Sequence, residues 1–142
     1  MEIKYTDKIS VADYNYLRKS VEWAELESNQ ALEGINNSAY LISAVVNNKT
    51  VGVTRVVSDG GYIALIVDVI VSPDFQGNGI GKTMMRKAMD YIKSTVSNGR
   101  IVLVNIMSAK GKESFYSQFG FEERPTEKLG AGMTQWIYYH AG

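Results

Sequence analysis

A glycine-rich stretch between an apolar segment and a helical segment constrains the fold of this 142-residue chain more than any other feature. Residues 62–71 are almost wholly apolar, residues 76–82 read Gln-Gly-Asn-Gly-Ile-Gly-Lys, and residues 82–96 have helical spacing. A short apolar run bounded by turn residues predicts a buried strand. Strand, glycine-rich turn and helix together predict a phosphate site, because glycine lets main-chain N–H groups approach closely and a helix N-terminus carries partial positive charge.

Two common phosphate-binding motifs come close to this stretch and do not fit it. The P-loop pattern needs a glycine five positions before its Gly-Lys-Ser/Thr, and ahead of residues 81–83 that position is Gln76. A dinucleotide fingerprint that used Gly77 and Gly79 would need glycine or alanine where Lys82 stands. The phosphate-bearing ligand is therefore of another kind.

The pattern that does fit is Gln/Arg-x-x-Gly-x-Gly/Ala, with Gln76, Gly79 and Gly81 at its fixed positions. This pattern resembles the coenzyme A loop of the GNAT family of N-acetyltransferases. Residues 68–75 resemble the family's fourth strand and the turn that leads to the loop, and residues 115–121 resemble its (L/F)-Y-x-x-x-G-F segment. The resemblance is strong from residue 62 to residue 121, and two motifs in the right order are far more specific than either alone.

Length and composition exclude several classes of protein and of site. The length predicts one domain over residues 1–142. Lysine plus arginine and aspartate plus glutamate number 15 each, so no overall charge favours nucleic acid or an acidic membrane as partner. The sequence contains no cysteine, which excludes disulfides, thiolate metal sites and a thiol nucleophile. We expect no metal site.

The sequence pattern does not predict an association with membranes. The first residues lack a basic region followed by an apolar run, so we expect no signal peptide. No apolar run approaches the roughly 20 residues that span a bilayer. The expectation is a cytoplasmic protein.

The apolar patterns predict an α/β protein (α+β, mixed sheet) with helices on both faces of a central sheet. The GNAT resemblance implies the same mostly antiparallel sheet of about seven strands. Ser10 is a plausible N-cap for the first helix. The expected helices are residues 11–21, 29–35, 82–96 and 112–118. The expected strands are residues 2–5, 40–46, 50–57, 62–71, 100–107, 121–123 and 133–139, with those at 62–71 and 100–107 buried.

The resemblance implies acetyl-CoA as cosubstrate and assigns mainly main-chain groups to hold it. A bulge in the family's fourth strand opens an edge to which the pantetheine arm pairs, and one N–H group there polarises the thioester carbonyl as an oxyanion hole does. The loop at residues 76–82 would hold the pyrophosphate. The predicted cofactor-binding residues are Val69, Ile70, Val71, Gln76, Gly77, Asn78, Gly79, Ile80, Gly81, Lys82, Lys112 and Phe115.

Two residues are predicted to be catalytic, each with an alternative. Tyr116 matches the family's general-acid tyrosine, which protonates the departing thiolate; the alternative is an aromatic packing residue. Asp68 interrupts an apolar run and is a candidate base for the amine. The alternative for Asp68 is a buried carboxylate satisfied by a partner such as Arg55. One departure from the family is Ala109, where many members have asparagine, and Ser108 or Lys112 are candidates to replace it.

Together these features predict an N-acetyltransferase that moves the acetyl group of acetyl-CoA to a primary amine of a small molecule or peptide. Without a cysteine to carry the acetyl group, the amine attacks the thioester directly in a ternary complex. The alternative is a non-catalytic acyl-CoA-binding or sensing module. The last predicted strand leaves a homodimer open. The sequence specifies neither the acceptor amine nor the length of the acyl chain.

Overall fold

The computed structural model describes residues 1–141, which form two compact units, Met1–Ile106 and a second that begins at Met107. The first unit contains a five-stranded sheet of order β1-β2-β3-β4-β5. The first three pairings are antiparallel and β4 pairs with β5 in parallel, so the sheet is mixed, as predicted. The strands are β1 (Lys4–Thr6), β2 (Tyr40–Val46), β3 (Lys49–Ser58), β4 (Ile63–Val71) and β5 (Leu103–Ile106).

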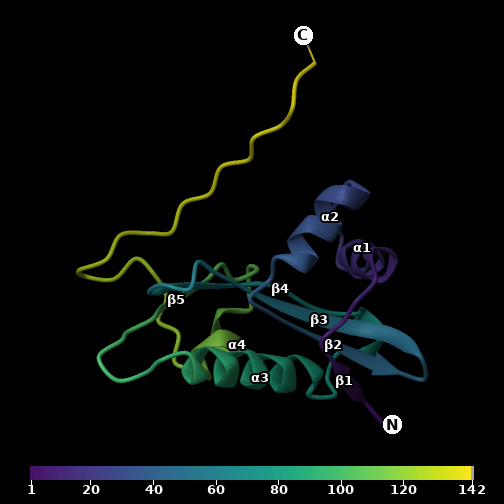
Figure 1. Ribbon diagram of the computed structural model, residues 1–142, viewed down its shortest axis with the longest axis horizontal. Coiled ribbons are helices and arrows are strands. Elements are labelled where there is room, and N and C mark those ends of the chain that lie inside the picture. The colour runs from purple at the N-terminus through teal and green to yellow at the C-terminus, as the bar shows by residue number, and fades with distance from the viewer. Residues whose placement is uncertain (142) are drawn as a thin grey trace. The chain divides into compact units, whose positions relative to one another are not determined.

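Helices cover both faces of this sheet, as the sequence predicted. In Figure 1, α1 (Val11–Ser20) and α2 (Ser28–Asn36) lie on one face and α3 (Ile80–Ser94) on the other. The Ser10 side chain accepts a hydrogen bond from the Asp13 main-chain N–H at 3.0 Å, which confirms it as the N-cap of α1. No helix among residues 1–141 is long and apolar enough to cross a membrane.

Two apolar layers hold the helices to the sheet. On the side of α1 and α2, the side chains of Tyr14 and Leu17 pack with Val53 and Ile70. On the side of α3, the layer consists of Ile42, Ala44, Val46, Val51, Ile80 and Met84. Each of these side chains is at most 7% exposed, so the buried sheet supplies a rigid frame for the segment that follows β4.

Strand β4 contains a bulge. Arg55 of β3 pairs with Val67 and Val53 pairs with Ile70, so three steps along β4 match two steps along β3. The extra residue falls at Asp68, whose φ of 55° lies in the left-handed region. A bulge of this kind bends a strand and interrupts its ladder.

The bulge also exchanges the faces of β4. Ala64, before it, borders a cavity together with Tyr91 and Ile92 of α3. Ile70, six residues further on, packs instead among the side chains of α1. Since side chains alternate with a period of two along a regular strand, the extra residue accounts for this change of side.

The second unit contains one helix, α4 (Glu113–Ser117), within the predicted range of residues 112–118. The predicted strands at residues 121–123 and 133–139 were wrong for the isolated chain, and the sheet has five strands among residues 1–141 rather than about seven. A strand exists through hydrogen bonds to a neighbouring strand, and the described part of the chain gives neither segment such a partner.

Strand β5 is shorter and more exposed than predicted. The sequence pattern indicated a buried strand over residues 100–107, whereas β5 spans four residues and Leu103 is 49% exposed. The reason is its place in the sheet, since β5 is the terminal strand and has a strand neighbour only at β4. Helix α3, by contrast, was predicted over residues 82–96, and each of its two ends lies two residues earlier than predicted.

Candidate functional site

The glycine-rich loop connects β4, through a short 3-10 turn at Pro73–Phe75, to the N-terminus of α3. Two side chains fix its course. The Gln76 side-chain amide donates to the Val71 carbonyl at 2.9 Å, and the Asn78 amide donates to the Phe75 carbonyl at 3.1 Å. The first bond holds the loop against the end of β4 and the second holds it against the 3-10 turn, so side chains of the loop itself define its conformation.

The loop presents free main-chain N–H groups at the start of α3. Gly77 and Gly79 have φ values of 82° and 76°, which a residue with a Cβ rarely adopts. Among residues 1–141, no acceptor is recorded for the N–H groups of residues 77–82, and the first bond of the helix runs from the Thr83 N–H to the Gly79 carbonyl. A Cβ placed on either glycine would meet nothing within 4 Å, so open space lies in front of the loop.

This arrangement fits a phosphate group. Residues 76–79 are exposed, and Gly79 caps α3 without a side-chain hydrogen bond. Unsatisfied N–H groups at a helix N-terminus favour an anion both by direct donation and through the helix dipole. The predicted loop residues therefore lie together with donors available, and all but Ile80, which is buried, and Gly81, which is partly buried, are exposed.

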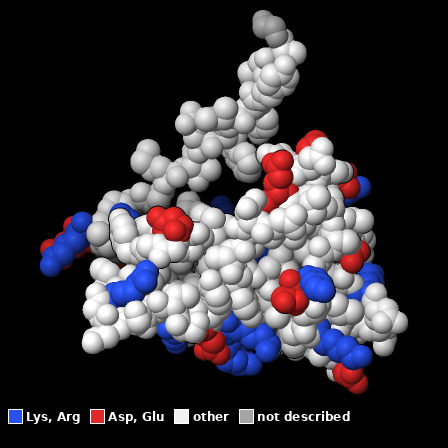
Figure 2. All heavy atoms as spheres, viewed as in Figure 1, with Lys and Arg blue, Asp and Glu red and all other residues white. Residues whose placement is uncertain are grey.

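Basic side chains line the exposed side of α3. Lys82, Arg86, Lys87 and Lys93 are all exposed. Blue side chains gather at the lower edge of Figure 2, where Figure 1 places this helix. Lys82 lies in the first turn of the helix, so its charge adds to that of the N-terminus.

Beyond the bulge, β4 has one free edge. Its pairing with β5 ends at Ile66, opposite Ile106, while residues up to Val71 continue to pair with β3. The predicted cofactor contacts Val69, Ile70 and Val71 lie on this stretch. Their main-chain groups on the side of β5 have no strand partner within the first unit, and an extended ligand with amide groups can pair with such an edge.

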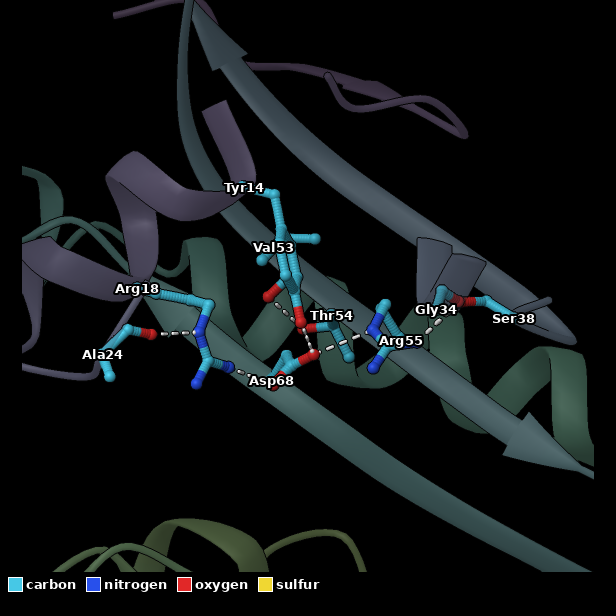
Figure 3. Close-up of polar contacts among 9 residues, drawn as sticks. All are labelled: Tyr14, Arg18, Ala24, Gly34, Ser38, Val53, Thr54, Arg55 and Asp68. Carbon is cyan, nitrogen blue, oxygen red and sulfur yellow. Dashed lines mark hydrogen bonds and ion pairs between the residues drawn. The ribbon is translucent and has the colours of Figure 1, made fainter. Parts of the chain in front are cut away.

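Asp68 lies within the bulge and forms a dense polar cluster with side chains from α1 and β3 (Figure 3). Its carboxylate accepts hydrogen bonds from the Tyr14 hydroxyl at 2.5 Å and from the Arg55 Nε at 2.8 Å, both at Oδ2. Arg18 Nη1 lies 3.5 Å from Oδ1. The side chains of Asp68 and Arg18 are each 11% exposed, so the ion pairs are largely shielded from water.

The sequence indicated only part of this cluster. It named Arg55 as a partner for Asp68, and it assigned neither Tyr14 nor Arg18 to that carboxylate. The available signal was that Tyr14 and Arg18 are four residues apart and therefore share one face of α1, where an arginine needs a buried anion.

Tyr116 belongs to the second unit, together with Lys112 and Phe115. Helix α4 carries Tyr116, whose side chain is buried, and burial raises the pKa of its phenol. The Phe115 ring packs edge-on against Tyr116 with ring centroids 5.1 Å apart. Lys112 is the exposed N-cap residue of α4, and its main-chain N–H donates to the Ala109 carbonyl at 3.0 Å. The raised pKa keeps the Tyr116 hydroxyl protonated at neutral pH.

The Tyr14 phenol makes a testable contribution to stability. Its pKa is raised, first by burial and then by the charge and hydrogen bond of Asp68. A raised pKa in the folded state means that this stability is complete below the ordinary value of 10.0 and is lost as pH rises through the folded pKa. We expect Tyr14→Phe to lower the free energy of unfolding by about 1.5–3 kcal/mol at pH 8, and by less above pH 10.

Urea denaturation of wild type and Tyr14→Phe from pH 8 to pH 11 measures this difference. Tyr62→Phe, at an exposed tyrosine, is the matched control and should leave the free energy of unfolding unchanged at each pH. If the free energy of unfolding of the wild type exceeds that of Tyr14→Phe by the same amount from pH 8 to pH 11, the assignment of the raised pKa to Tyr14 is contradicted.

Comparison with known proteins agrees with this geometry. A family model described as an acetyltransferase (GNAT) domain matches residues 11–137. The uncharacterized N-acetyltransferase ycf52 of Pyropia yezoensis is 30% identical over 121 residues, which cover 82% of this chain and 67% of that protein. A histone acetyltransferase TAP1 from Glycine max is 25% identical, over 82% of this chain and 54% of that protein.

Solved structures give the same result. A probable acetyltransferase from meticillin-resistant Staphylococcus aureus aligns with a TM-score of 0.84 and 29% identity, over 97% of this chain and 100% of that chain. Glucosamine-6-phosphate N-acetyltransferase from Arabidopsis thaliana aligns with a TM-score of 0.74 over 97% of this chain and 100% of that chain. At 17% identity, that likeness concerns the fold alone.

Proposed function

Because this chain belongs to the GNAT family of acetyltransferases, we propose that it transfers the acetyl group of acetyl-CoA to a primary amine of a small molecule or peptide. The observation that carries the proposal is the set of main-chain N–H groups at residues 77–82 that have no acceptor among residues 1–141, at a loop whose residues 76–79 are exposed. Acetyl transfer is the activity of the family, and acetyl-CoA is its cosubstrate. The choice of a primary amine as the acceptor goes beyond the activity that the family shares.

The residues of the first unit suit the two polar parts of coenzyme A. The loop at residues 76–82 would hold the pyrophosphate, with Lys82 adding positive charge beside it. Val69, Ile70 and Val71 would offer the free edge of β4 to the pantetheine arm. An N–H group of this edge directed at the thioester carbonyl would stabilise the negative charge that develops there.

Tyr116 is the proposed general acid. A phenol of raised pKa is always protonated at neutral pH and so always has a proton to donate. Transfer of this proton to a departing thiolate, whose pKa is about 8.5, is uphill by about 2 kcal/mol or more. The phenol therefore helps by stabilising the negative charge as it develops on the sulfur. Phe115 packs against the ring and limits its orientations. The proposed cofactor contact of Lys112 rests on its exposed position at the start of α4.

The acetyl group passes directly to the amine in the proposed mechanism. The sequence has no cysteine to carry it, and a direct attack needs both substrates bound at once. Asp68 was predicted either as the base for the amine or as a buried partner of Arg55. Its hydrogen bonds from Tyr14 and Arg55 and its ion pair with Arg18 favour the second role.

Tyr116→Phe separates an enzyme from the alternative, a non-catalytic acyl-CoA-binding module. Loss of the hydroxyl removes the acid, so we expect kcat to fall about 100-fold while coenzyme A binds as before. Thiol release from acetyl-CoA with a panel of amines gives kcat, and calorimetry gives the affinity for coenzyme A. Tyr62→Phe, the same change at an exposed tyrosine outside the predicted site residues, should leave both values unchanged. A wild type that binds coenzyme A yet acetylates no amine would support the alternative.

The partner is proposed to be an amine acceptor, and neither nucleic acid nor a membrane is expected, given the even balance of charge. A histone acetyltransferase and a glucosamine-6-phosphate N-acetyltransferase are both among the similar proteins, so similarity does not select one acceptor. A cytoplasmic location stays a prediction.

A second copy of the chain is the proposed partner of residues 133–139. The segment has the composition of a strand, and its large apolar side chains are exposed. Such a surface is unusual unless it is covered by a partner. The exposed residues and fractions are Met133 93%, Trp136 73%, Ile137 86%, Tyr138 68% and Tyr139 91%.

If this segment joins two copies, Trp136→Asp should convert a dimer to a monomer without unfolding it. Light scattering coupled to gel filtration measures the mass, and circular dichroism measures folding. Tyr62→Asp, at a residue that is 57% exposed in the first unit, is the control and should stay dimeric. A wild type of monomeric mass at high micromolar concentration would rule the proposal out.

A further inference from the structure

Asp68 has a main-chain conformation that needs support. Its φ of 55° occurs within β4 rather than in a turn. A left-handed conformation outside glycine is strained and persists only where neighbouring groups hold it. Aspartate tolerates it better than most residues, because its short polar side chain forms local bonds. The question is what holds the bulge in place.

Three side chains converge on the Asp68 carboxylate, two through hydrogen bonds and one through an ion pair, and two of the three come from α1. Tyr14 donates its hydroxyl to Oδ2 at 2.5 Å, and Arg18 Nη1 lies 3.5 Å from Oδ1 (Figure 3). Arg18 is itself fixed, because its Nε donates to the Ala24 carbonyl at 2.8 Å. The bulge of β4 is thus tied to the helix and to the chain that follows it.

The third side chain ties the bulge to α2. Arg55 Nε donates to Asp68 Oδ2 at 2.8 Å. The same guanidinium donates through Nη1 to the Gly34 carbonyl at 2.8 Å and to the Ser38 hydroxyl at 3.0 Å. Since Arg55 lies on β3 opposite Val67, it joins both strands of the bulge to the C-terminal end of α2.

The contacts of the cluster oppose a role as base. Two guanidinium groups face one carboxylate, and the Arg55 side chain is only 14% exposed. Charge-assisted bonds of this kind are among the stronger polar contacts in proteins. Both carboxylate oxygens are engaged by these groups and by Tyr14, and the Asp68 side chain is only 11% exposed, so little of it is open to a substrate amine.

We propose that Tyr14, Arg18, Arg55 and Asp68, which we name the Asp68 clamp, are positioning residues for acetyl transfer. The clamp holds the bulge of β4, and the bulge sets the direction in which the main-chain groups of residues 69–71 point. Through those groups the clamp positions the thioester without touching it. This inference rests on the proposed function, because it presumes that the free edge of β4 binds acetyl-CoA.

Variants of the clamp test this inference by the affinity for acetyl-CoA. In Asp68→Asn the side chain keeps its shape and loses its charge, and in Asp68→Gly the backbone keeps its freedom to adopt positive φ. Arg55→Met leaves the carboxylate in place and removes its principal donor. We expect each variant to bind acetyl-CoA about 10-fold more weakly by calorimetry, and kcat/KM to fall about 100-fold.

The control is Glu25→Gln. Glu25 pairs with Lys19 of α1 at 3.9 Å, in an exposed ion pair outside the clamp. Loss of this ion pair should change neither the affinity for acetyl-CoA nor kcat/KM. Thermal unfolding establishes which variants are folded. Should the three variants fail to fold, Arg18→Met removes the longest of the three contacts to Asp68, at 3.5 Å, together with the bond to the Ala24 carbonyl, and is expected to weaken binding by a smaller factor.

Other outcomes separate the possibilities. If folded Asp68→Asn binds acetyl-CoA like wild type but has lost turnover, and an amine of low pKa restores it, then Asp68 is the base and the clamp is overturned. Equal affinity and equal turnover in all folded variants would also overturn it, while the proposed function stands. A wild type that does not bind acetyl-CoA would overturn the proposed function, and the clamp with it.

Discussion

The unsatisfied main-chain N–H groups at the start of α3 are the feature on which the site depends. A helix leaves its first donors without partners, and here neither a capping side chain nor a neighbouring segment of residues 1–141 accepts them. Left-handed φ values at Gly77 and Gly79 keep the backbone of the loop in this exposed path. An anion that accepts several of these bonds would replace water without displacing any contact within the protein.

The bulge at Asp68 links this loop to the rest of the first unit. One extra residue interrupts the regular ladder with β3, and the parallel pairing with β5 ends at Ile66. It also places Ile70 among the side chains of α1, on the opposite face from Ala64. The strained residue, the free edge and the phosphate loop thus follow one another between residues 68 and 82.

Much of this arrangement was predictable because it is local. The spacing of apolar residues gave β2 its bounds and α3 its extent within two residues, and Ser10 marked the start of α1. The predictions that failed were those for features that depend on residues distant in the sequence. Residues 133–139 have a strand's composition without a strand's neighbour, and β5 lies at the sheet's edge. Arg18 meets Asp68 across 50 positions, which no spacing along the sequence reveals.

Main-chain amide chemical shifts test the central claim most directly. In a nitrogen-15 spectrum of the whole chain, coenzyme A should shift the amide signals of residues 77–82 saturably, because the pyrophosphate becomes their acceptor. Signals of those residues that stay fixed with coenzyme A, and move instead with ATP or NAD, would contradict the account.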